Sequence, residues 1–207
     1  MKAFQRLSAT LFDAAMAPLE SGRLRRVRRS LLRGAAGSVL EIGAGTGVNL
    51  RYYDSRRVSS LTLSDLDDRR LVLTERVRRD CPDLEGRVAV TRIDAQRLPF
   101  SDGAFDTVVA TLLFCSVECP PCGLDEIARV LAPGGRYLFL EHVRPEHPRL
   151  ARVFDSINPL WNGVSRGCNL NRDTIREMEI AGFTLARKRQ DRNGVFVWGE
   201  ARHDPER

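Results

Sequence analysis

The sequence contains no apolar run long enough to cross a membrane. A membrane-spanning helix needs about 18 or more consecutive apolar residues, and no stretch of this 207-residue chain reaches that length. The first residues, MKAFQRLSATLFDAAM, also lack the unbroken hydrophobic segment and the small-residue cleavage pattern of a secretion signal. We therefore expect a cytoplasmic protein.

Lysine is nearly absent, although the chain is basic. Only Lys2 and Lys188 are lysines among 33 lysine and arginine residues, and the net charge is +6. This balance is compatible with nucleic acid, anionic lipid or an acidic substrate, and it does not choose among them. An arginine cluster between Arg23 and Arg33 surrounds an apolar stripe. We expect a solvated helix face there, with weak contact to an anionic membrane as the alternative.

Nothing in the composition indicates disorder or a disulfide scaffold. Apolar residues make up 43% of the chain and charged residues 29%, which is ordinary for a soluble globular protein. The length fits one domain over residues 1–207. The expected parts are an N-terminal helical cap (1–37), a core (38–143), a lid or substrate insertion (144–172), and a C-terminal helix and hairpin (173–202).

Strand-type apolar runs alternate with helix-compatible segments from residue 38 onward. The expected strands are Ser38–Ile42, Ser60–Leu63, Val88–Ile93, Phe105–Phe114, Arg136–Glu141, Thr184–Arg189 and Val195–Ala201. Helices are expected over residues 3–33, up to about Tyr53, and over Asp67–Arg79, Leu124–Leu131 and Asp173–Ala181. This alternation predicts an α/β, Rossmann-like fold with a seven-stranded, mostly parallel sheet and helices on both faces. The Asn193-Gly194 turn predicts a C-terminal hairpin with one antiparallel edge strand.

A glycine-rich turn follows the first expected strand. Gly43, Gly45 and Gly47 have the spacing G-x-G-x-G, and glycines let a backbone turn tightly and approach a ligand. Asp65 lies 22 residues after Gly43, at the end of the second expected strand. In open α/β sheets ligands bind beyond the carboxyl ends of the strands, so Asp65 is placed to bind two ribose hydroxyls. Its alternative role is that of a helix N-cap.

The third expected strand ends in a second acidic segment. Asp94 is placed to accept a hydrogen bond from an adenine amino group, and the Ala95 amide is placed to donate to a ring nitrogen. Taken together, EIGAGTG, Asp65, DAQRLPFSDGAFD and EIARVLAPGGRYLFLEH resemble class I S-adenosylmethionine-dependent methyltransferases over about Val39 to Phe183. Within that family the chain looks like the small-molecule branch, which includes quinone methyltransferases.

The resemblance implies S-adenosylmethionine as the methyl donor, S-adenosylhomocysteine as the product, and no metal. It implies cofactor contacts from the glycine turn and from the ends of four strands, namely Glu41, Gly43, Ala44, Gly45, Gly47, Asn49, Asp65, Leu66, Asp94, Ala95 and Thr111. For Glu41 two roles stay open, which are orienting the turn and reaching the ligand's amino group through water.

A narrower resemblance concerns the acceptor. TLLFCSV, LEHV and GCNLNRDT resemble membrane-associated methyltransferase-like proteins that methylate thiols, although this sequence lacks their hydrophobic N-terminal anchor. The acceptor pocket is then expected to include Phe12, Met16, Trp161, Cys168 and Asn169. For Trp161, Phe12 and Met16 the alternative is core packing.

His142 is the candidate catalytic base. It directly follows Glu141 at the end of the fifth expected strand, and imidazole titrates near neutral pH. A purely structural histidine is the alternative. A phenol needs a base more than a thiol does, because its pKa of about 10 exceeds the thiol's pKa of about 8.5.

The five cysteines are expected to be free thiols, because the count is odd and the chain is expected in the cytoplasm. The spacing of Cys115, Cys119 and Cys122 is that of an iron–sulfur motif. We expect no iron–sulfur cluster, because these cysteines follow a strand of a methyltransferase-like sheet. We expect no zinc site either, because zinc would need a fourth ligand.

Three functions remain open. The first is methyl transfer to a small, apolar acceptor, with a thiol first and a hydroxyl or ring carbon of a quinone-like or polyketide-like metabolite next. The second is a cofactor-binding regulator without turnover. The third is a nucleic-acid methyltransferase; nucleic acid is not expected as a partner, because TLLF stands where amino methyltransferases of that class carry an Asx/Ser-Pro-Pro-aromatic motif. The oligomeric state stays open.

Overall fold

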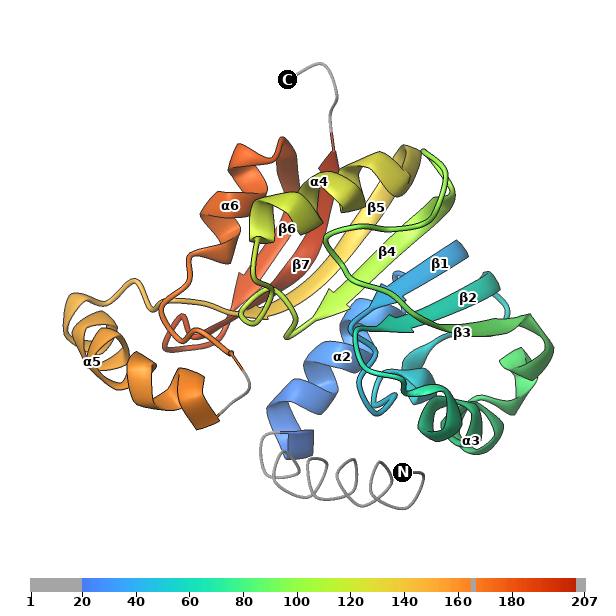
Figure 1. Ribbon diagram of the computed structural model, residues 1–207, viewed down its shortest axis with the longest axis horizontal. Coiled ribbons are helices and arrows are strands. Elements are labelled where there is room, and N and C mark those ends of the chain that lie inside the picture. Colours follow the sequence, from blue (N-terminus) through green and yellow to red (C-terminus); the bar gives the residue numbers. More distant parts are fainter. Residues whose placement is uncertain (1–19, 165–166, 204–207) are drawn as a thin grey trace.

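A computed structural model describes residues 20–164 and 167–203. Phe12 and Met16 lie outside the described residues. Within these ranges seven strands form one sheet in the order β3-β2-β1-β4-β5-β7-β6 (Figure 1). The strands are β1 (Gly37–Ile42), β2 (Val58–Asp65), β3 (Val88–Arg92), β4 (Phe105–Thr111), β5 (Leu131–His142), β6 (Phe183–Gln190) and β7 (Phe196–His203). The α/β Rossmann-like architecture is confirmed.

Helices cover both faces of the sheet (Figure 1). They are α2 (Arg25–Leu32), α3 (Arg70–Asp80), α4 (Pro120–Val130), α5 (Pro148–Val164) and α6 (Thr174–Ile180), with short turns η1 (Glu20–Leu24), η2 (Leu50–Tyr52) and η3 (Pro82–Arg87). Two apolar cores result. One joins α4 and α6 to the sheet through residues such as Ile127 and Met178, and the other joins α2 and α3 to it through Leu32 and Leu73.

The antiparallel strand does not lie at the edge, and that expectation was wrong. β7 pairs antiparallel with both β5 and β6, so it lies inside the sheet, while β6 is the outermost strand on that side. Burial explains the order, because Val197, Gly199 and Ala201 of β7 are buried whereas most of β6 is exposed. A Cβ on Gly199 would lie 1.8 Å from the Arg187 carbonyl oxygen, so this close strand pairing requires glycine.

Several element boundaries also differ from expectation, most clearly after the glycine turn and at the start of β5. The segment from the glycine turn to Tyr53 forms only the short turn η2 instead of a helix, because Gly43, Gly45 and Gly47 all have positive φ. β5 begins at Leu131, ahead of the expected Arg136. Its register with β4 shifts between these two residues, which places the Pro-Gly-Gly segment in an irregular part of the strand.

The insertion contains a long helix that the sequence analysis did not predict. α5 spans 17 residues and lies apart from the rest of the body in Figure 1. Its exposed apolar residues recur at helical spacing, and they are Val153, Ile157, Leu160 and Trp161. Among the described residues no helix is both long and apolar enough to span a membrane.

Candidate functional site

The glycine turn directly follows the carboxyl end of β1. Gly43, Gly45 and Gly47 have φ values of 71°, 56° and 81°. A Cβ on Gly43 would lie 2.8 Å from Leu113 Cδ1, so the turn packs directly against the segment after β4. Beside Gly45 the nearest atom to a Cβ would be 4.0 Å away, which leaves its backbone open to a ligand.

Asp65 supports this turn. Its Oδ2 accepts a hydrogen bond from the Gly45 amide at 2.8 Å, and its Oδ1 accepts one from the Asp67 amide at 3.0 Å. The helix N-cap alternative is wrong, because α3 begins at Arg70. Each carboxylate oxygen retains a second lone pair, so the half-buried side chain can still accept two hydroxyl groups. Leu66 beside it is 62% exposed.

A buried polar network lies under the turn. The side-chain Nδ2 of Asn49 donates to Glu41 Oε1 at 2.8 Å and to Thr111 Oγ1 at 3.0 Å. The Tyr53 hydroxyl donates to Glu41 Oε2 at 2.7 Å. Burial raises the pKa of Glu41, against the hydrogen bonds from Tyr53 and Asn49. Both Glu41 oxygens therefore bind protein groups, which favours the role of orienting the turn.

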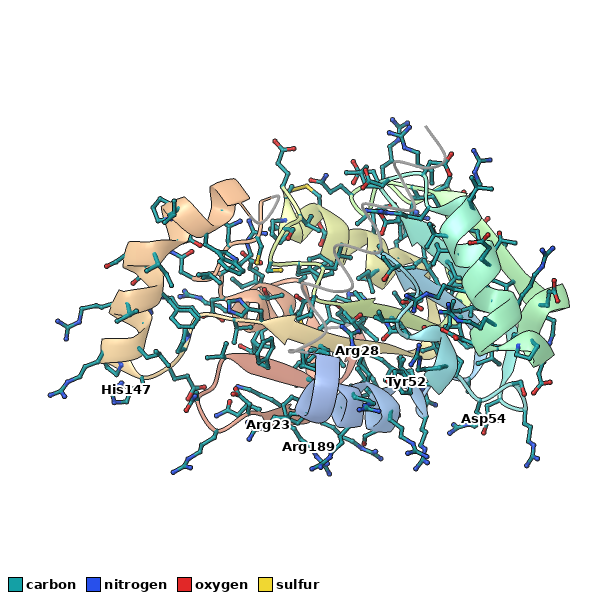
Figure 2. The ribbon with its side chains drawn as sticks, turned by 90° about the horizontal axis from the view of Figure 1, so that it is seen from below. Arg23, Arg28, Tyr52, Asp54, His147 and Arg189 are labelled. Carbon is teal, nitrogen blue, oxygen red and sulfur yellow. A yellow bond between two sulfur atoms is a disulfide. The ribbon has the colours of Figure 1, made fainter. Side chains whose placement is uncertain are left out.

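Arg28 completes the network, and the sequence analysis did not single it out. It is only 3% exposed, and its Nη1 donates to Asn49 Oδ1 at 2.8 Å and to Thr111 Oγ1 at 2.7 Å. Figure 2 shows Arg28 on the side of α2 that faces the sheet. The arginine cluster is thus a solvated face, as expected, except at this position. The helical spacing of Arg28 with Leu24 and Leu31 was the available signal.

Asp94 and Ala95 lie beside Asp65, because β2 and β3 pair in parallel and the Ile93 amide donates to the Asp65 carbonyl at 3.0 Å. The Asp94 carboxylate is exposed and accepts from the Gln96 amide at 2.9 Å. Ala95 is buried. The two residues are therefore at the same sheet edge as the glycine turn, as expected.

His142 lies in an aromatic environment at the end of β5. Its ring stacks on Phe154 of α5 with a centroid separation of 5.8 Å and contacts the edge of Phe196 at 5.7 Å. Its Nδ1 is buried with no hydrogen-bond partner among the described residues. Burial lowers its pKa to about 4, so the imidazole is neutral at pH 7 and is a weak base.

Glu141 is a buried acid that the sequence analysis named only as the neighbour of His142. Its Oε1 accepts from the amides of Leu113 and Phe114, each at 3.2 Å, while its buried Oε2 has no partner in the described part of the chain. Burial raises its pKa to about 8, against the backbone hydrogen bonds. Glu141 thus supports the segment after β4, and it is mostly protonated at neutral pH.

The thiols of Cys115 and Cys168 meet where the insertion contacts this segment. The Asn169 amide donates to the Cys115 carbonyl at 2.8 Å, and its side chain donates to the same oxygen at 3.2 Å. A hydrogen bond from Cys115, with further help from the Trp161 side chain and the charge of Arg172, lowers the pKa of Cys168 to about 6. The hydrogen bond to Cys168, together with burial, raises the pKa of Cys115. The structure therefore brings together Trp161, Cys168 and Asn169 from the expected acceptor pocket.

The expectation of free thiols was wrong for two of the five cysteines. Cys119 and Cys122 form a disulfide at the start of α4. One helical turn separates them, which gives a Cα–Cα distance of 5.4 Å, within the range that a disulfide requires. Cys81, Cys115 and Cys168 form no disulfide. Residues 20–164 and 167–203 contain no cluster of three or more His, Cys, Asp or Glu side chains able to hold a metal.

Comparison with known proteins agrees with this geometry. A family of methyltransferase domains matches residues 40–139. The human thiol S-methyltransferase TMT1B is 33% identical over 83% of this chain and 73% of its own length. The ubiquinone/menaquinone biosynthesis C-methyltransferase UbiE of Ectopseudomonas mendocina is 36% identical over 57% of this chain and 46% of its own length.

A solved structure shares the fold. The complex of DhpI with S-adenosylhomocysteine superposes with a TM-score of 0.69 at 18% identity, over 98% of this chain and 95% of that one. The glycine turn, the acidic strand ends, the seven-stranded sheet and these relatives lead to one conclusion. The chain belongs to the class I S-adenosylmethionine-dependent methyltransferases.

Proposed function

We propose that the chain transfers a methyl group from S-adenosylmethionine to the sulfur of a small, apolar thiol. The observation that carries this proposal is the position of the segment from Leu112 to Cys115. One end packs on Gly43 of the glycine turn, and the other end binds Asn169 next to Cys168. A donor held by the turn and an acceptor held at Cys168 would meet across this segment.

The residues around the turn fit the cofactor. The open backbone beside Gly45 and the remaining lone pairs of Asp65 suit a ribose, and Asp94 and Ala95 lie at the neighbouring strand end. When bound, S-adenosylmethionine supplies an electrophilic methyl group on a positively charged sulfur. Such a reaction depends mainly on alignment and on exclusion of water, which positioned groups provide.

Leu112 fixes the local backbone between donor and acceptor. It is the one non-glycine residue with positive φ, 56°, in the described ranges, and its amide donates to the Leu140 carbonyl at 2.6 Å. Strained backbone of this kind concentrates at functional sites. Glu141, which binds the next two amides, holds the strained segment in place.

Cys168 is the candidate proton acceptor for a thiol. The hydrogen bond from Cys115 lowers the pKa of Cys168 and favours its thiolate form, while burial leaves His142 a weak base. In this proposal the thiol proton would pass to Cys168 Sγ as the acceptor sulfur forms its bond to the methyl carbon. The bond from that carbon to the donor sulfur would break, with its electron pair left on the donor sulfur. The relative TMT1B, a thiol S-methyltransferase, supports the same acceptor class.

Methylation of a hydroxyl or ring carbon on a quinone-like molecule is the second candidate. The relative UbiE supports it, and so does the unpartnered Nδ1 of His142, which could accept a hydrogen bond from a hydroxyl group.

Mass spectrometry with matched thiol and alcohol acceptors on one carbon frame separates the two candidates. We expect S-methyl product from the thiol alone. Cys168→Ser should lower its rate by about tenfold and move the pH profile upward, since a serine hydroxyl is a far weaker base. His142→Ala and the control Cys81→Ser should leave the thiol rate nearly unchanged. Product from alcohols or quinols only, lost in His142→Ala, would instead establish the second candidate.

A further inference from the structure

The outer side of α2 carries positive charge without matching acidic residues. Its sequence, RRVRRSLL, has no carboxylate, and Arg29 and Arg33 are exposed one helical turn apart. Like charges at this spacing repel each other. Among the described residues neither of these two arginines forms an ion pair with a carboxylate.

A pocket of about 330 Å³ opens beside these two arginines. Its other side is formed by residues of η2 and the loop that follows, among them Arg51, Tyr52 and Ser55. Figure 2 shows Tyr52 next to α2, with Asp54 farther along the same lower side. Three arginines therefore line the pocket, two from α2 and its end and one from the segment of Tyr52 and Ser55.

Positive charge dominates this pocket even after its acidic neighbours are counted. Asp54 is the acidic residue of the lining, and its Oδ1 accepts a hydrogen bond from the Arg56 amide at 3.0 Å. Arg51 pairs with Asp80 at 3.3 Å, outside the lining. The lining itself therefore carries three positive charges and one negative charge, and Arg29 and Arg33 are the two of these arginines that are not paired with Asp80.

The pocket is separate from the cofactor turn. Arg33 precedes β1 and Ser55 precedes β2, whereas Gly43 follows β1 and Asp65 is the last residue of β2. The two strands run parallel, so Arg33 and Ser55 are at the opposite end of them from the turn. The lining approaches the network under the turn through Tyr53, whose hydroxyl donates to Glu41. An anion bound here would not occupy the site proposed for S-adenosylmethionine.

We propose that this pocket binds the phosphate group of a small anionic molecule or of a lipid headgroup. The guanidinium fork matches a phosphate with two parallel hydrogen bonds, and several arginines around one pocket favour a tetrahedral oxyanion over a single carboxylate. The volume lies at the low end of ligand pockets, about 300–1,000 Å³, which suits a phosphate with a small substituent.

The test uses the full chain and needs no methyl transfer. Inorganic phosphate and glycerol 3-phosphate are titrated by calorimetry, and vesicles of phosphatidylcholine with or without phosphatidic acid are tested by co-sedimentation. The variant R29Q/R33Q removes two charges from the lining. R25Q/R26Q removes two charges from the same helix outside the lining and serves as the matched control. Thermal unfolding verifies that both variants fold.

We expect R29Q/R33Q to weaken phosphate binding by about tenfold or more, and R25Q/R26Q to change it by less than about twofold. Binding of glycerol 3-phosphate without vesicle capture would identify a soluble ligand. Capture by phosphatidic acid vesicles that R29Q/R33Q abolishes would identify a lipid headgroup. Equal losses in the two variants would mean diffuse attraction and would overturn the proposal, as would absence of binding by the unmodified chain to every probe.

Discussion

At the scale of single residues, carboxylates at the carboxyl ends of strands have different roles. Glu41 and Glu141 are each the next-to-last residue of a central strand and are fully buried, and both bind protein groups. Asp65 ends its strand and is half-buried. Burial therefore separates the acids that bind protein groups from the acid proposed to bind a ligand.

Asp65→Ala should weaken S-adenosylmethionine binding by at least about tenfold. The change removes a charged acceptor of two hydroxyl groups, each bond contributing roughly 1.5–3 kcal/mol, and it frees the Gly45 amide. Isothermal calorimetry measures the affinity. Asp68→Ala is the control, because that exposed carboxylate pairs with Arg70 and, in the described part of the chain, forms no hydrogen bond with the glycine turn. Unchanged affinity in Asp65→Ala would move the ribose away from this side chain.

The residues that could be predicted from the sequence are those whose role depends on a short stretch of chain. The glycine turn and Asp65 are examples, because strand ends and spacing alone place them at one sheet edge. Arg28 and the thiol pair were not predictable in this way. Arg28 meets Thr111 83 residues away, and Asn169 meets Cys115 54 residues away, so tertiary packing decides both contacts. The short Cys119–Cys122 pair was missed because the expected compartment argued against disulfides.

At the scale of elements, α5 combines an anchored end with an exposed apolar side. The loop after it is held to the segment after β4 by Asn169 and by Arg172, which donates to the Val117 carbonyl at 2.6 Å. The helix was missed because Pro, Asn, Arg and Gly in this stretch indicated a loop, although Val153, Ile157 and Leu160 have helical spacing. Its exposed side chains fit the approach of an apolar acceptor.

The double variant Ile157→Ser/Leu160→Ser tests this role of α5. We expect KM for an apolar thiol to rise about fivefold, equivalent to about 1 kcal/mol of lost apolar burial, while the unfolding free energy changes little because both side chains are exposed. Steady-state kinetics across thiols of increasing chain length measure the effect. Arg152→Ser, also exposed on α5, is the control. A KM in the double variant that equals that of the unmodified protein for every thiol would assign α5 no part in acceptor binding.

At the scale of the whole molecule, buried titratable groups couple stability to pH. The folded pKa of Glu141, about 8, exceeds its ordinary value of 4.5, so the folded protein retains a proton that the unfolded chain releases. This contribution of Glu141 to the free energy of unfolding is fully present below pH 4.5 and is lost as the pH rises through 8. His142 acts oppositely, because its folded pKa of about 4 is below 6.5, and its contribution is lost as pH falls between these values.

Glu141→Gln should remove the pH-dependent contribution of Glu141 to stability. Glutamine can still accept from the Leu113 and Phe114 amides, but it does not titrate. The stability of the variant relative to the unmodified protein should therefore increase with pH between 4.5 and 8, by at most about 1.4 kcal/mol per pH unit. Urea unfolding at a series of pH values measures the difference. A difference that does not vary with pH would mean that Glu141 is already ionised in the fold.

The outermost strand β6 also affects how copies of the molecule behave toward one another. An uncovered sheet edge offers unpaired backbone groups to a second chain, and charged side chains are a common protection. Arg187, Lys188 and Arg189 are consecutive and exposed on this edge. Two such edges that approached one another would bring like charges together, so this side of the sheet resists aggregation. Added salt would screen that repulsion, and concentrated solutions should be most prone to self-association at high ionic strength.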